Sequence, residues 1–177
     1  MGCQLQAIFS QFSAFGFSGS RSGVPSLGAA SRAAACVPSG GSVFVGCARG
    51  VDEFFRGQFP AAVVFSVASG EFGSGVSAFA RRSVACISAV TAAGGLWVSF
   101  PSGACPAGLL PSSRSSACFC GSGSGSWASL AFALGSGCAC LVFLGSVPCP
   151  RGWGLAAVPG WSGWFFAPAA PVQSSLF

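Results

Sequence analysis

Glycine and serine alternate from Cys120 to Ser126, in the sequence CGSGSGS, and an apolar segment rich in alanine and leucine follows. This pattern is typical of a glycine loop that opens into a buried helix. Backbone N–H groups at a helix N-terminus bind phosphate, because they point outwards at the positive end of the helix dipole. We therefore predict a phosphate site at this loop, and a flexible Gly/Ser linker is the alternative. The residues of the predicted site are Gly123, Ser124, Gly125 and Ser126.

The charged residues are few, and they exclude several kinds of catalytic site. The chain has eight arginines, no lysine, no histidine and three acids, with a net charge of +5. Without histidine there is no Ser-His-Asp or Cys-His site, and without lysine there is no P-loop lysine. The segment 73–78, GSGVSA, resembles a dinucleotide fingerprint, but no acid follows Glu71 to bind a ribose hydroxyl. We therefore expect no NAD site.

Cysteine usage indicates buried thiols in a reducing compartment. The ten cysteines are sparser than in small disulfide-stapled secreted domains, and the first charged residue, Arg21, comes too late for the basic region of a signal peptide. The pairs at 118/120 and 138/140 lack the two-to-four-residue spacing of zinc ligands. We expect a cytoplasmic protein with no metal and no cofactor.

Short apolar runs alternate with helix-like segments along the chain. Strands are expected at about 42–47, 61–68, 96–100 and 138–144, with a further strand ending near Gly19. Helices are expected over 27–36, 53–59 and 76–93, and directly after the glycine loop. This alternation predicts an α/β fold with a doubly wound, mostly parallel, Rossmann-like sheet of five or more strands and helices on both faces.

The length of 177 residues favours one domain. We expect residues 1–149 to form the Rossmann-like domain, with the Pro-, Ser- and Cys-rich stretch 101–120 as an inserted loop. Residues 150–177 are expected to be a tryptophan-rich C-terminal tail of little regular structure that packs on this domain.

Several of the few charges follow predicted strands. Arg21, Arg49 and Asp52 each come directly after a strand, and Arg82 lies in the first turns of the helix over 76–93. In a doubly wound sheet the carboxyl ends of the strands meet at a crevice where ligands bind. We therefore expect these side chains to gather beside the glycine loop. Arginines scattered over a solvated surface are the alternative.

Four short motifs follow one another along the chain: GSR at 19–21, VGCARGVD at 45–52, FARR at 79–82 and SGSWAS at 124–129. Together they resemble the Rossmann-like superfamily that joins DNA-processing protein A (Smf/DprA) to the LOG nucleotide hydrolases. The matching motifs of the DNA-processing proteins read G-S-R, S-G-x-A-R-G-I-D, F-x-x-R-N-R and S-G-S-L-x-T. The chain departs from them at Ser83, where the family has asparagine, and at the stretch 101–120.

The resemblance implies a domain that binds a nucleotide or single-stranded nucleic acid by its phosphates. Besides the glycine loop, the site residues that it implies are Gly19, Ser20, Arg21, Ala48, Arg49, Gly50, Asp52 and Arg82. An enzyme like the LOG proteins, a nucleotide N-glycosidase or phosphoribohydrolase, is the alternative. In this chain Ser129 occupies the position of the LOG glutamate, so we expect no catalytic residues.

Two further interpretations compete with a folded binding protein. Few residues have adenine in the middle of their codons, which is also expected of a spurious reading frame. The uncharged run 128–147 has the length of a membrane span, but Gly-Ser-Gly interrupts it, so we expect no membrane partner. A surface with so few charges needs a partner for solubility, and a homodimer is one such assembly.

Overall fold

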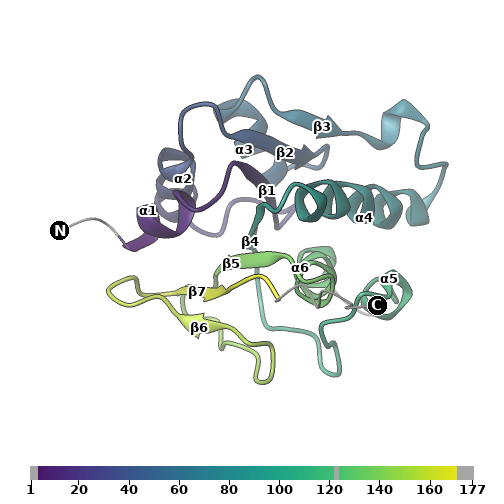
Figure 1. Ribbon diagram of the computed structural model, residues 1–177. Helices are drawn as coiled ribbons and strands as arrows, with labels where there is room; N and C mark the ends of the chain where they lie inside the picture. Colours follow the sequence, from purple (N-terminus) through teal and green to yellow (C-terminus); the bar gives the residue numbers. More distant parts are fainter. Residues whose placement is uncertain (1–3, 122–123, 171–177) are drawn as a thin grey trace, which may run out of the picture.

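The computed structural model describes residues 4–121 and 124–170. In these residues seven strands form one sheet, in the order β3-β2-β1-β4-β5-β7-β6 (Figure 1). The strands are β1 Ala14–Gly19, β2 Ser42–Gly46, β3 Val63–Phe65, β4 Leu96–Phe100, β5 Ala139–Phe143, β6 Ala156–Ala157 and β7 Trp164–Ala167. Strands β1 to β5 pair in parallel, whereas β7 is antiparallel to both β5 and β6.

Helices cover both faces of this sheet. They are α1 Gln4–Phe9, α2 Leu27–Cys36, α3 Val51–Gln58, α4 Val76–Ala92, α5 Ser115–Cys118 and α6 Gly125–Gly135. Helices α1, α2 and α3 pack on one face, and α4 and α6 pack on the other. The doubly wound, mostly parallel α/β fold predicted from the sequence is therefore confirmed.

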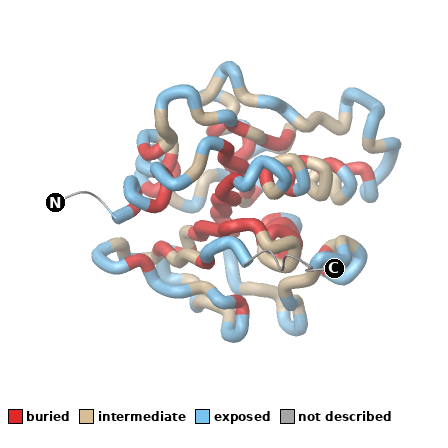
Figure 2. The backbone as a smooth tube through the Cα atoms, viewed as in Figure 1, coloured by how far each residue is buried: buried red, intermediate tan, exposed pale blue. Residues whose placement is uncertain are grey.

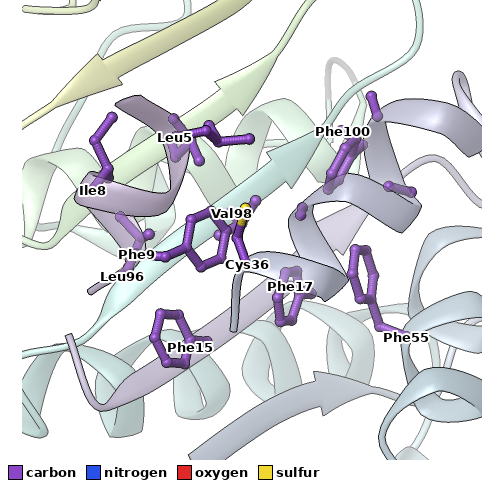
Figure 3. Packing of buried hydrophobic residues seen from close by; sticks show 14 of the residues in the cluster. Leu5, Ile8, Phe9, Phe15, Phe17, Cys36, Phe55, Leu96, Val98 and Phe100 are labelled. Carbon is purple, nitrogen blue, oxygen red and sulfur yellow. The ribbon is translucent and has the colours of Figure 1, made fainter. Parts of the chain in front are cut away.

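Alternating side chains of the central strand divide the core between the two faces. Phe15 and Phe17 of β1 point to the first face, where they lie beside Phe9 of α1 and Phe55 of α3 (Figure 3). The ring centroids of Phe17 and Phe55 are 3.8 Å apart. All four rings are buried, and burial of apolar surface contributes about 25 cal/mol per Å². This cluster holds α1 and α3 against the sheet.

The opposite face is built around Trp97 of β4. This side chain is fully buried beneath α4 and α6, and the adjacent residue of β1 is Gly16. A Cβ atom on Gly16 would overlap the Trp97 ring and the side chain of Val90. Gly16 is therefore required at the centre of β1 because the indole occupies the space that a side chain would need. The central strands and α6 form the buried interior in Figure 2.

The edge strand β3 is shorter than the predicted run 61–68. It has a neighbour on one side only, and Val63 and Val64 are 51% and 45% exposed. The chain leaves the sheet at Ser66, whose side chain accepts a hydrogen bond from the Ala68 N–H and starts a 3-10 turn over Val67–Ser69. An apolar, β-branched sequence thus extends beyond the part that has a partner strand.

Part of the described tail is more regular than the sequence indicated, although most of it consists of turns and irregular segments. Strand β7 extends the sheet by pairing with β5, and β6 pairs with β7. Trp164 of β7 is buried, with ring centroids 5.2 Å from Phe143 and 5.6 Å from Phe100. The tail as far as Ala167 therefore belongs to the sheet and its core.

The run 128–147 does not form the membrane span that its length allows. It is divided between α6 and β5, with a turn over the Gly-Ser-Gly segment. Among residues 4–121 and 124–170, no helix has the length and apolarity needed to cross a bilayer.

Candidate functional site

A cleft of about 1010 Å³ opens at the carboxyl ends of β1 and β4. These two strands are neighbours, but the chain from β1 leads to β2 on one side and the chain from β4 leads to β5 on the other. The loops that leave them therefore diverge, which leaves a crevice of the kind where ligands bind in doubly wound sheets. The walls of the cleft come from the loop after β1, the start of α4, the stretch after β4 and the start of α6.

The cleft brings together most of the residues predicted from the sequence. Those that line it are Gly19, Ser20, Arg21, Ala48, Asp52, Arg82, Ser124, Gly125 and Ser126. Arg49 and Gly50 do not line the cleft, and the Arg49 side chain is exposed to solvent. Gly123 lies outside the described residues.

The loop after β1 is held in place by backbone contacts. The Ser20 N–H donates to the Phe100 carbonyl at 3.1 Å, and the Val51 N–H donates to the Ser20 carbonyl at 3.1 Å. Gly50 adopts a positive φ of 72°, and a Cβ atom there would overlap the Ser20 carbonyl oxygen. Gly50 therefore acts on the site indirectly, because it allows the turn before α3 to approach the loop that carries Arg21.

Arg21 is an exposed cation with an oriented side chain. Its guanidinium carbon lies 4.7 Å from the centroid of the Phe79 ring on α4, in a cation–π contact. Both residues line the cleft. Phe79 therefore positions the charge of Arg21 at the mouth of the cleft, a role that the sequence motif FARR did not reveal.

Asp52 and Arg82 form a buried ion pair at the floor of the cleft. Arg82 Nη1 donates to Asp52 Oδ2 at 3.1 Å, and the Ala48 N–H donates to the same oxygen at 3.2 Å. Both side chains are less than a tenth exposed. Burial raises the pKa of Asp52, an effect that the Arg82 charge and the Ala48 N–H oppose. Arg82 is therefore first a structural partner of Asp52, and its Nε–H has no acceptor among the described residues.

Gly46 provides the space for this ion pair. It is the last residue of β2, and a Cβ atom there would overlap both Arg82 Nη1 and Asp52 Oδ2. Its carbonyl oxygen accepts a hydrogen bond from Arg56 Nη1 at 2.6 Å. Gly46 lies inside the motif VGCARGVD, but only the packing shows why that position lacks a side chain.

The first turn of α6 faces the cleft without a side-chain cap. Ser124 is the N-cap residue, but its Oγ lies 2.6 Å from the Ser126 Oγ and caps no backbone N–H among the described residues. The first hydrogen bond into the helix runs from the Ala128 N–H to the Ser124 carbonyl. Ser129 Oγ donates to the Gly125 carbonyl at 2.8 Å. No side chain of the described residues therefore occupies the amides of the first turn, where a helix can bind an anion.

The stretch 101–120, predicted as an inserted loop, is fixed to α6. Trp127 Nε1 donates to the Gly103 carbonyl at 3.1 Å, and the Ser112 N–H donates to the Ala131 carbonyl at 3.2 Å. A Cβ atom on Gly135 would overlap the Ser112 backbone, so the two segments are in close contact. Sequence reasoning assigned this stretch no role in the site, because it has neither a periodic pattern nor a charged motif.

Thiol reactivity tests the packing of α4 at the floor of the cleft. Cys86 of α4 is buried in the core, and burial raises the pKa of its thiol to about 12, whereas Cys120 is exposed. Since the thiolate is the reactive form, we expect iodoacetamide at pH 8 to modify Cys120 in the folded protein and Cys86 only after unfolding in urea. Peptide mass spectrometry after a timed pulse measures both. Equal rates in the folded protein would contradict the packing of α4 described above.

No family model, no curated protein and no solved structure matches this chain. The membership of the DNA-processing and LOG superfamily therefore stays a prediction that rests on four motifs. What the fold adds is their arrangement: residues of all four motifs line one cleft, although they are far apart in the sequence.

Proposed function

We propose that the chain binds a nucleotide or single-stranded nucleic acid by its phosphates, in the manner of the DNA-processing proteins. The bound phosphate lies between the first turn of α6 and the loop after β1. The backbone amides at Gly125 and Ser126 donate to its oxygens, and Arg21 supplies a positive charge that carries no ion pair in the described residues.

The observation that carries this proposal is the unpartnered Nε–H of Arg82. A buried N–H without an acceptor costs about 1–3 kcal/mol, and a guanidinium has more donors than the single Asp52 oxygen uses. An anion in the cleft would place a second negative charge near this guanidinium. The start of α6, which no side chain of the described residues caps, lines the same cleft, so two independent features favour an anionic ligand.

Arg21→Ala tests the proposal, with Arg151→Ala as its matched control. Both changes remove one exposed arginine, but Arg151 lies in the tail and does not line the cleft. We expect Arg21→Ala to weaken binding of a fluorescent oligonucleotide or nucleotide about tenfold, since a charge-assisted hydrogen bond contributes about 1.5–3 kcal/mol. Arg151→Ala is expected to change little. Anisotropy titrations at two salt concentrations measure both, and equal losses would mean that diffuse positive charge alone attracts the ligand.

The hydrolase alternative has weaker support from the site. Asp52 is the only carboxylate among the described lining residues, and its Oδ2 is engaged by Arg82 and by the Ala48 N–H. Ser129, at the position of the LOG glutamate, hydrogen-bonds to a backbone carbonyl. Glycoside cleavage needs a carboxylate that stabilises an oxocarbenium-like transition state. We therefore favour binding without turnover.

A further inference from the structure

The stretch 101–121 forms a wall of the cleft that differs in character from the phosphate side. The residues that it contributes include Pro106, Leu109 and Phe119, and none of its described lining residues is charged. Arg114 belongs to the same stretch, but it does not line the cleft. The arginines that line the cleft therefore come from other segments, whereas the stretch 101–121 contributes an uncharged and largely apolar part of the lining.

This wall is attached to α6 near its start, its middle and its end. Besides the two hydrogen bonds to Trp127 and Ala131, the Phe119 ring lies 6.3 Å from the ring of Phe132 on α6. Cys118 is buried, and its thiol donates to the Ser112 carbonyl at 3.4 Å. The same helix thus presents its first turn to a phosphate and carries the wall that faces the rest of the ligand.

The small number of charged residues in the cleft indicates how many phosphates a ligand there can have. Sites for single-stranded nucleic acid are positively charged grooves that follow the backbone over several nucleotides. Here the charged lining residues among those described are Arg21, Asp52 and Arg82, and none of them belongs to the stretch 101–121. A second and third phosphate would find no further arginine among the described lining residues. The volume of about 1010 Å³ lies at the upper end of the range for small-molecule sites.

We propose that the stretch 101–121 provides a nucleobase subsite, which makes the cleft a site for a single free nucleotide and not for a polynucleotide. This inference rests on the proposed phosphate binding and adds the class of ligand. The phosphate lies at the start of α6, and the base lies against Pro106, Leu109 and Phe119. Apolar and aromatic surface favours a base, because every base has a π-face that stacks without sequence preference.

The test fills the space beside the stretch 101–121 and leaves the residues of the proposed phosphate site unchanged. Ala107 is an exposed residue of the wall, and Ala107→Trp would place an indole where the base is expected. Ala104→Trp is the matched control, because Ala104 is exposed in the same stretch but lies outside the cleft. Calorimetry is carried out with the four common nucleoside 5′-monophosphates, ribose 5-phosphate and the oligonucleotide (dT)20.

We expect the wild-type chain to bind at least one nucleoside monophosphate about tenfold or more tightly than ribose 5-phosphate or (dT)20. Ala107→Trp is expected to reduce that affinity to the level of ribose 5-phosphate, whereas Ala104→Trp has no effect. If ribose 5-phosphate or (dT)20 binds as tightly as the monophosphates, or if Ala107→Trp changes nothing, the base subsite is wrong and phosphate binding stands. If none of these probes binds, both proposals fail.

Discussion

Gly125→Asp is expected to abolish phosphate binding without harming the fold. A Cβ atom at Gly125 meets no heavy atom of the described residues within 4 Å, and the residue opens α6 at the edge of the cleft. The new carboxylate would repel a phosphate where backbone amides attract it. The loss of a charge-assisted bond alone is worth about 1.5–3 kcal/mol, so with repulsion added we expect affinity to fall by about 100-fold or more.

The stability of Gly125→Asp is not expected to fall with its affinity. An acidic residue in the first turn of a helix interacts favourably with the helix dipole, by about 0.3–1 kcal/mol. The urea midpoint of Gly125→Asp is therefore expected to equal or exceed that of the wild type. Gly125→Asn has nearly the same size without the charge, and it is expected to retain much of the affinity. If the asparagine variant loses binding as completely as the aspartate variant, bulk is responsible and the phosphate is not where we place it.

Gly46→Ala is expected to be among the most destabilising single changes in the chain. The added methyl group would occupy the space of Arg82 Nη1 and Asp52 Oδ2, so the ion pair has to separate or the strand has to move. Breaking a buried ion pair costs about 3–5 kcal/mol, because it leaves a charge without compensation. Arg82→Ala is expected to cost a similar amount for the same reason. Urea unfolding followed by circular dichroism measures both.

Gly57→Ala provides the matched control for this prediction. Gly57 lies within α3, and a Cβ atom there meets nothing within 4 Å. Alanine in a helix is favoured over glycine by about 0.5–1 kcal/mol, so this variant is expected to be slightly more stable than the wild type. Should Gly46→Ala behave like Gly57→Ala, the close packing of β2 against the ion pair would be refuted.

The sequence predicts the place of Arg82 at the site but not its role. Its place in the motif FARR and in the cleft was predicted, but a direct phosphate contact was the role expected of it. The structure pairs its guanidinium with Asp52, and the partnership joins residues 30 positions apart. The sequence indicated that Asp52 would orient an arginine or cap the following helix, but no pattern within either motif shows which arginine it contacts. A loss of binding in Arg82→Ala would therefore combine a disturbed fold with a lost ligand contact. Arg21 is the better residue for testing whether positive charge binds the phosphate.

The fold was more predictable than the site, because its elements are encoded locally. Apolar runs of strand length between glycines gave β1, β2, β4 and β5 nearly at their observed bounds. Strand β7 was missed, since WFFA at 164–167 stands among prolines and glycines and its pairing with β5 is a long-range contact. The wall at 101–121 was missed for the same reason: hydrogen bonds to α6 determine its position, and they leave no periodic trace in the sequence.

The central place of β1 in the sheet has a consequence for synthesis on the ribosome. β1 pairs with β2, which follows soon after it, and with β4, which follows much later: Ser18 meets Ser99 at a separation of 81 residues. Translation at roughly 5–20 residues per second means that β1 waits about 4–16 s for this neighbour. During that time the nascent chain exposes one unpaired edge of β1 and the aromatic surface that β4 later covers. The growing polypeptide is therefore open to aggregation, and in need of a chaperone, at least until residue 100 has left the exit tunnel.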